Sequence, residues 1–185
     1  MKAGIRSKLS GYLINKEIKS AQRKGEVVSI DRAKTIGILY DATNDNDYEI
    51  VKNYVRQLMS DSKDVIALGY IDKKDLPGTR FMKLGLDFFT QKSLNWKMKP
   101  YNPIVNSFIG RDVDILIYFN VNKCIPLAYV ANQVKARFRI GRYDLAYAGL
   151  FDFMIKIDES AGLKQMIEQV NHYLNLIRNE KYSEI

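Results

Sequence analysis

The sequence predicts an α/β protein, a Rossmann-like three-layer sandwich with a mainly parallel sheet, preceded by an N-terminal amphipathic helix. Continuous apolar runs such as Val65–Ile71 and Val113–Phe119 are typical of strands that are buried on both faces of a parallel sheet. Amphipathic helical patterns alternate with these runs and place helices on both faces. Right-handed crossovers then favour a doubly wound topology.

Segment 1–24 is predicted to be a basic amphipathic helix. Its apolar side chains recur at three- to five-residue spacings, which predicts one apolar stripe. The stripe consists of Ile5, Leu9, Tyr12, Leu13 and Ile18, and Gly25 is a suitable stop. Seven Lys or Arg residues oppose the single acid Glu17, so this segment carries a net charge of +6, whereas the rest of the chain is near neutral.

Segment 34–185 is predicted to form the sheet, so that residues 1–185 make a single α/β domain. The predicted strands are Lys34–Tyr40, Val65–Ile71, Leu86–Thr90, Val113–Phe119, Arg137–Ile140 and Phe151–Ile157. Predicted helices follow the first strand, cover Leu127–Val134 and begin near Ser160, which is a good N-cap.

Composition narrows the class of protein. The chain is 46% hydrophobic and 27% charged, as expected of an ordinary globular protein. One cysteine excludes an internal disulfide, which makes the cytoplasm the expected location. The apolar runs are shorter than the roughly 18 to 20 residues that a membrane-spanning helix needs.

Two loops are expected to face each other across the sheet. Ligands of open parallel sheets bind beyond the carboxyl ends of the strands, where the strand order reverses. If Lys34–Tyr40 and Val113–Phe119 are central neighbours, the loops that follow them line that crevice. The candidate ligand-binding residues in these loops are Asp41, Thr43, Asn44, Asn120, Asn122 and Cys124.

These residues also have structural interpretations. Asn44 or Asn46 is a suitable N-cap for the next helix, whose first turn is acidic. Cys124 precedes a helix, whose dipole lowers a thiol pKa, but a thiol nucleophile usually has a histidine partner. The only histidine, His172, is expected on the solvent face of the last helix. A small, partly buried side chain is therefore the favoured interpretation of Cys124.

No cofactor and no metal are predicted. The loop after the first strand lacks the G-x-G-x-x-G glycines that let backbone amides approach a pyrophosphate. Asp41, Thr43 and Asp45 have the spacing of the opening of an EF-hand, but Asn46 replaces its turn glycine. One histidine and one cysteine do not make a zinc site of the usual kinds.

A second basic cluster contains Arg137, Arg139 and Arg142. Arginines are suitable bidentate donors to a phosphate or an anionic sugar. Apolar and charged residues alternate in Ala136–Ile140, which is also typical of an edge strand with one solvent-exposed face. Charges on such a strand discourage edge-to-edge pairing, and this interpretation is favoured.

Segments Asp112–Asn122, Leu127–Val134 and Ala136–Gly141 resemble the N-terminal half of bacterial heptosyltransferase-type glycosyltransferases. There a strand with a polar end, a helix and an Ala-Arg-x-Arg-Ile-Gly-like turn follow in this order. The resemblance implies an acceptor-side Rossmann half. It assigns no catalytic residue to this chain, because that family has a glycine-containing loop after its first strand and binds its sugar nucleotide mainly in a second domain. The whole chain also resembles a family of short bacterial α/β proteins whose function is not known.

Two functions remain open. The leading interpretation is a non-catalytic or accessory module whose N-terminal helix docks on a protein partner, a dimer mate or an anionic membrane surface. Packing of this helix on its own sheet is the structural alternative. The second function is binding of, or catalysis on, a nucleotide or phosphosugar at the crevice around Asp41 and Asn120. Nucleic-acid binding is disfavoured, because the basic residues lack a recognition motif.

Overall fold

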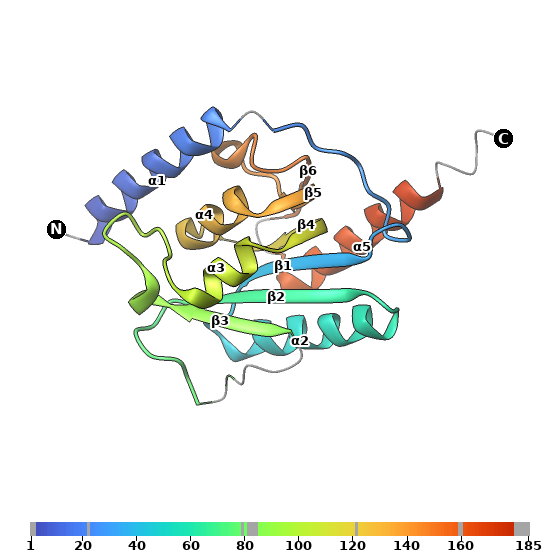
Figure 1. The fold of residues 1–185 in the computed structure, drawn as a ribbon, viewed down its shortest axis with the longest axis horizontal. Coiled ribbons are helices and arrows are strands. Elements are labelled where there is room, and N and C mark those ends of the chain that lie inside the picture. Colours follow the sequence, from blue (N-terminus) through green and yellow to red (C-terminus); the bar gives the residue numbers. More distant parts are fainter. Residues whose placement is uncertain are drawn as a thin grey trace.

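The computed structural model describes residues 3–21, 23–78, 80, 85–120, 122–158 and 161–179 (Figure 1). Within these residues one sheet is formed by β1 (Thr35–Asp41), β2 (Asp64–Ile71), β3 (Leu86–Thr90), β4 (Asp112–Phe119), β5 (Lys135–Arg142) and β6 (Phe153–Ile155). The helices are α1 (Ala3–Ser20), α2 (Asp45–Ser60), α3 (Pro103–Ile109), α4 (Ile125–Gln133) and α5 (Leu163–Asn179). Two short 3-10 turns are η1 (Gln91–Ser93) and η2 (Leu145–Tyr147).

All neighbouring strands are parallel, in the order β3-β2-β1-β4-β5-β6. This order confirms the predicted Rossmann-like sandwich. The direction in which strands are added reverses at β1, which lies between β2 and β4. Tyr40 pairs with Phe119 near the carboxyl ends of β1 and β4, which confirms that these two strands are central neighbours.

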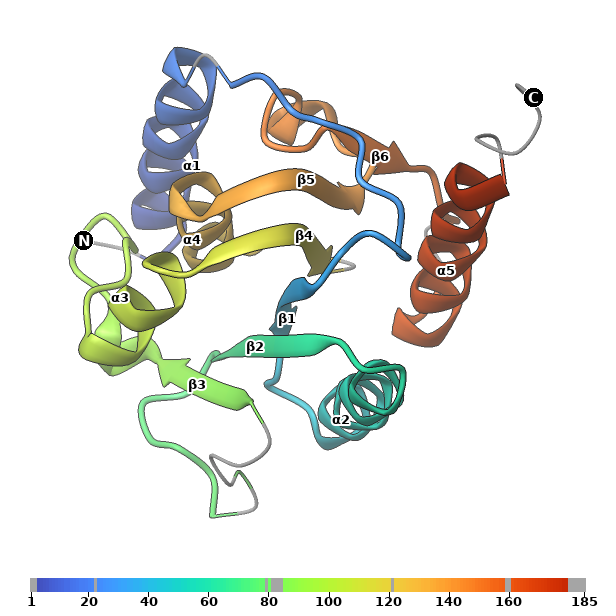
Figure 2. The same cartoon turned by 45° about the vertical axis from the view of Figure 1, so that its right-hand side comes forward.

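Helices cover both faces of the sheet (Figure 2). On one face, α2 and α5 pack on Ile36, Ile38 and Tyr40 of β1. On the other face, α3 and α4 share a core with Leu39, and α1 packs against α4. Alternate side chains of β1 therefore enter both cores, which explains why the strand is continuously apolar.

Helix α1 has two different apolar faces. Ile14 and Ile18 are buried in the core that contains α4, whereas Ile5, Leu9 and Tyr12 are 57%, 40% and 67% exposed. The prediction of one stripe is therefore wrong. Each residue turns the helix by about 100°, so that Ile18 and Leu9 project from opposite sides. We call Ile5, Lys8, Leu9, Tyr12, Lys16 and Lys19 the outward face of α1, and all six are exposed.

Several boundaries differ from expectation. The helix α3 was missed because its seven residues are too few to show a helical period. Asn102 caps α3 by accepting a hydrogen bond from the N–H of Val105 at 2.7 Å. The first helix ends at Ser20 rather than near residue 24, and the last predicted strand is only the three residues of β6. The expected N-cap Ser160 lies outside the described residues.

Residues 23–28, which we call the strap, pass beside the first half of β5. Only the last part of β5, Ile140–Arg142, pairs with β6. In the first half, the carbonyl of Arg137 accepts hydrogen bonds from the N–H of Glu26 at 3.0 Å and from the guanidinium of Arg23 at 2.9 Å. Arg23 also donates to the carbonyl of Ala136. The strap thus satisfies backbone groups that would otherwise form an open sheet edge.

Gly25 in the strap provides a test of this packing. A Cβ at this position would overlap the carboxylate of Asp152, which also accepts a hydrogen bond from the N–H of Arg139 at 2.7 Å. Gly25→Ala is therefore expected to lower the free energy of unfolding in urea by about 1–3 kcal/mol. Gly162→Ala is the control, because a Cβ there meets no atom within 4 Å. Equal stability of the two variants would show that the strap does not pack in this way.

Candidate functional site

The two loops predicted to face each other lie together at the carboxyl ends of β1 and β4. Asp41 and Asn44 from one loop, and Asn120 and Asn122 from the other, line a small hollow of about 70 Å³. Cys124 and Asp41 line a second hollow of about 230 Å³. The crevice therefore gathers five of the six predicted residues.

The first loop is held by its own polar side chains. The carboxylate of Asp41 accepts a hydrogen bond from the N–H of Thr43 at 2.9 Å. The side chain of Asn44 accepts from the N–H of Asp47 at 2.7 Å, which confirms Asn44 as the N-cap of α2. The sixth predicted residue, Thr43, accepts the N–H of Asp72 at 2.9 Å and so ties this loop to the end of β2.

Arg80 is a structural anchor of the first loop that sequence reasoning missed. Its side chain is almost completely buried and donates to the carbonyls of Ala42 at 2.9 Å and Asn44 at 3.0 Å. It also pairs with the carboxylate of Asp45 at 2.6 Å, and its guanidinium lies 4.2 Å from the ring centroid of Tyr48. A lone arginine after a Pro-Gly turn gives no sequence signal for this role.

The second loop is held by a buried hydrogen-bond chain. Asn120 donates to the carbonyl of Asn122 at 2.5 Å and to the hydroxyl of Tyr118 at 3.4 Å. That hydroxyl donates to the carbonyl of Cys124 at 3.2 Å. Burial raises the pKa of the Cys124 thiol and keeps it protonated, which opposes a role as nucleophile.

A larger cavity of about 460 Å³ opens beside the second loop, at the carboxyl ends of β4 and β5. Lys123 and Arg142 supply its cationic groups, and Asp144 its carboxylate. The Lys123 ammonium lies 3.6 Å from the carboxylate of Asp144. The other lining residues are aromatic, amide or apolar: Tyr118, Asn120, Asn122, Tyr143, Leu145, Tyr147 and Phe151.

Several of these cavity residues were not predicted. Tyr143, Asp144 and Tyr147 follow β5, which ends at the same edge of the sheet as β1 and β4. Because ligands of open parallel sheets bind beyond the carboxyl ends of the strands, the loop after β5 is also expected to line a binding site. The missing information was the full length of β5, which extends to Arg142 rather than to Ile140.

Residues 6–177, which are most of the chain, match the model of a protein family. The chain belongs to DUF6913, a family of unknown function. No curated protein and no solved structure matches it. The resemblance to heptosyltransferase-type glycosyltransferases and the bacterial origin therefore stay predictions.

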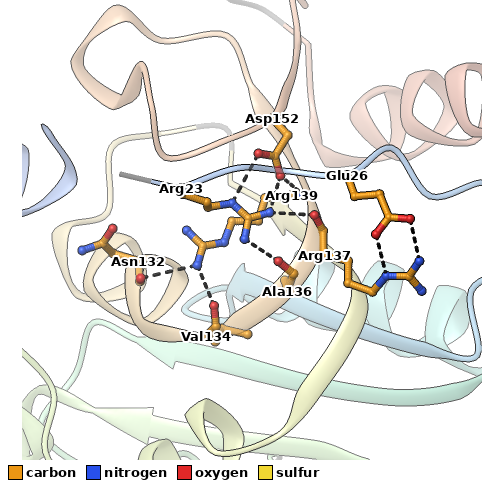
Figure 3. Close-up of polar contacts among 8 residues, drawn as sticks. All are labelled: Arg23, Glu26, Asn132, Val134, Ala136, Arg137, Arg139 and Asp152. Carbon is orange, nitrogen blue, oxygen red and sulfur yellow. Dashed lines mark hydrogen bonds and ion pairs between the residues drawn. The ribbon is translucent and has the colours of Figure 1, made fainter. Parts of the chain in front are cut away.

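The predicted anion-binding residues Arg137 and Arg139 bind groups of this DUF6913 chain itself (Figure 3). Arg137 contacts the carboxylates of Glu26 at 2.8 Å and Asp114 at 2.9 Å. Arg139 is 5% exposed and donates to the carbonyl of Val134 at 2.6 Å, just beyond α4. The pKa of Arg139 is lowered to about 10, mainly because its guanidinium is buried and also because the positive charge of Arg23 lies nearby.

These contacts fix the place of β5 in the DUF6913 fold. The favoured interpretation of this segment as an edge strand is wrong, because β5 is the second strand from the edge and the strap lies beside its first half. The side chain of Arg139 is turned into the protein towards the end of α4. Among the three arginines, Arg142 is the one that lines the 460 Å³ cavity.

Among the residues that the structure describes, no group of three or more His, Cys, Asp or Glu side chains is placed to hold a metal ion. In the same part of the chain, no helix is long and apolar enough to cross a membrane.

The buried state of Cys124 predicts a slow thiol reaction. Because its thiol is buried and its pKa is raised, we expect the native DUF6913 protein to react with a disulfide reagent such as DTNB at neutral pH far more slowly than the urea-unfolded chain does. The single cysteine makes the absorbance trace unambiguous. Equal rates for native and unfolded protein would contradict the buried, protonated thiol.

Proposed function

We propose that this protein binds a small anionic molecule of the nucleotide or phosphosugar class in the cavity beside Lys123 and Arg142. The observation that carries this proposal is the position of that cavity, at the carboxyl ends of β4 and β5 and next to the point where the strand order reverses. Open parallel sheets bind their ligands in this region. Its volume of about 460 Å³ lies within the usual range for small-molecule sites.

The lining residues suit a ligand with two different parts. Lys123 and Arg142 supply positive charge for a phosphate, which an arginine can also bind in a bidentate manner. Asp144 and Asn122 can accept hydrogen bonds from sugar hydroxyls, and the ring of Tyr143 offers a flat surface for a base or a sugar. We assign no catalytic step, because the buried Cys124 argues against thiol chemistry at this edge.

A thermal-shift panel tests the proposal. The panel contains nucleotides, nucleotide sugars and hexose phosphates, each with its dephosphorylated counterpart, and inorganic phosphate. We expect phosphorylated members to raise the melting temperature, because a ligand at 100 times its Kd stabilises the native state by about 2.7 kcal/mol. The dephosphorylated counterparts should give little or no shift.

Variants locate the binding. Lys123→Ala/Arg142→Ala should reduce the ligand-induced shift, measured from the melting temperature of the variant without ligand. Lys164→Ala on α5 is the control, because Lys164 is exposed and does not line this cavity. The proposal fails if no phosphorylated member produces a shift, or if the double variant responds as the wild type does.

We also propose that α1 is a docking element. This second role is supported by the three exposed apolar side chains of its outward face, Ile5, Leu9 and Tyr12. A protein partner, a second copy of the chain and an anionic membrane are the three classes of surface that such a face fits. Ile5→Gln/Tyr12→Gln should weaken the association, which sedimentation velocity detects for a self-associating chain and vesicle co-sedimentation for a membrane.

A further inference from the structure

The outward face of α1 is a continuous strip of apolar and basic side chains. Its six residues lie within a sector of about 100° on the helical wheel. Ile5, Leu9 and Tyr12 supply the apolar groups, and Lys8, Lys16 and Lys19 lie among them. This face therefore combines exposed apolar surface with three positive charges and contains no acid.

The rest of α1 is fixed to the domain. Ile14 and Ile18 are buried, and Arg6 donates to the carbonyls of Asn95 at 2.7 Å and Trp96 at 3.1 Å. The only acid of the helix, Glu17, lies 3.5 Å from the ammonium of Lys99. The helix can thus present its outward face without leaving the domain, and its carboxylate is held by a lysine of the neighbouring loop.

We propose that the outward face of α1 binds an anionic phospholipid membrane, with the helix axis parallel to the membrane plane. This inference rests on the proposed docking role of α1 and identifies a membrane as the surface on which α1 docks. The apolar side chains enter the headgroup region while the lysines contact lipid phosphates. Trp96, which is exposed in the loop that Arg6 contacts, is a residue type enriched at membrane interfaces.

Charge favours a membrane over a protein groove. Lysine is depleted in protein–protein interfaces, whereas half of the outward face is lysine. A stable protein interface also buries about 800 Å² on each partner, which is more than one strip of three apolar side chains supplies. Binding of a helix to an anionic membrane surface depends on buried apolar area and on electrostatic attraction, and the outward face supplies both.

The expected affinity is modest and depends on charge. A lysine near an anionic leaflet strengthens binding by about fivefold. Removing the charges of Lys8 and Lys16 should therefore weaken binding by about 25-fold, and reversing them should weaken it further. Because the attraction is electrostatic, added salt should also release the protein.

Co-sedimentation of the full chain with vesicles tests the inference. We expect binding to vesicles of phosphatidylcholine mixed with phosphatidylglycerol and little binding to phosphatidylcholine alone. Lys8→Glu/Lys16→Glu and, separately, Ile5→Gln/Tyr12→Gln should each weaken binding. The matched control is Lys156→Glu/Lys164→Glu, which makes the same charge change at exposed positions outside α1 and should bind nearly as the wild type does.

Three outcomes overturn the inference: no binding of the wild type to anionic vesicles, equal binding to neutral ones, or equal losses in the two lysine variants. Circular dichroism confirms that each variant is folded. Sedimentation velocity then distinguishes a failure of membrane binding alone from a failure of the docking role of α1. If Ile5→Gln/Tyr12→Gln dissociates a dimer, α1 docks on a second copy of the chain. If it changes neither vesicle binding nor self-association, docking of α1 on a membrane and on a second copy of the chain both fail.

Discussion

The parallel pairing of β1 with β4 is the interaction on which the arrangement of the crevice depends. Asp114 in β4 accepts the N–H groups of Lys34 at 2.7 Å and Thr35 at 3.1 Å, which fixes the start of β1. Partial burial alone raises the pKa of Asp114, yet these N–H groups and a neighbouring arginine hold it below its ordinary value. The same register brings Asp41 and Asn120 out of the sheet side by side, so the polar loops meet at the point where the strand order reverses.

The positive charge of the N-terminal segment is divided between two roles. Arg23 is used inside the molecule, where it binds carbonyls of β5 and the carboxylate of Asp152. Lys8, Lys16 and Lys19 lie on the outward face of α1 and are exposed. The segment is thus not a detachable basic arm, because its buried face and the strap that follows it are integral to the domain. The exposed lysines Lys8, Lys16 and Lys19 lie on one side of α1, and Lys24 is exposed in the strap.

Most of the sheet could be predicted, because strands that enter two cores are continuously apolar and stand out from amphipathic helices. The crevice loops could be predicted for the same reason, since polar residues directly follow these strands. The two faces of α1 could not be resolved, because spacings of three to five residues drift around the helix. Arg80 and Arg139 could not be assigned either, since their roles depend on carbonyls that only the folded chain brings within reach.

The cavity beside Lys123 and Arg142 is the site that we propose for a phosphorylated small molecule. The most direct measurement is a crystal structure of the full chain soaked with the phosphorylated compound that gives the largest thermal shift. We expect electron density for the ligand in this cavity, with its phosphate within hydrogen-bond distance of the ammonium of Lys123 and the guanidinium of Arg142. Density for the same ligand only at another place on the protein, with this cavity holding ordered water, would contradict it.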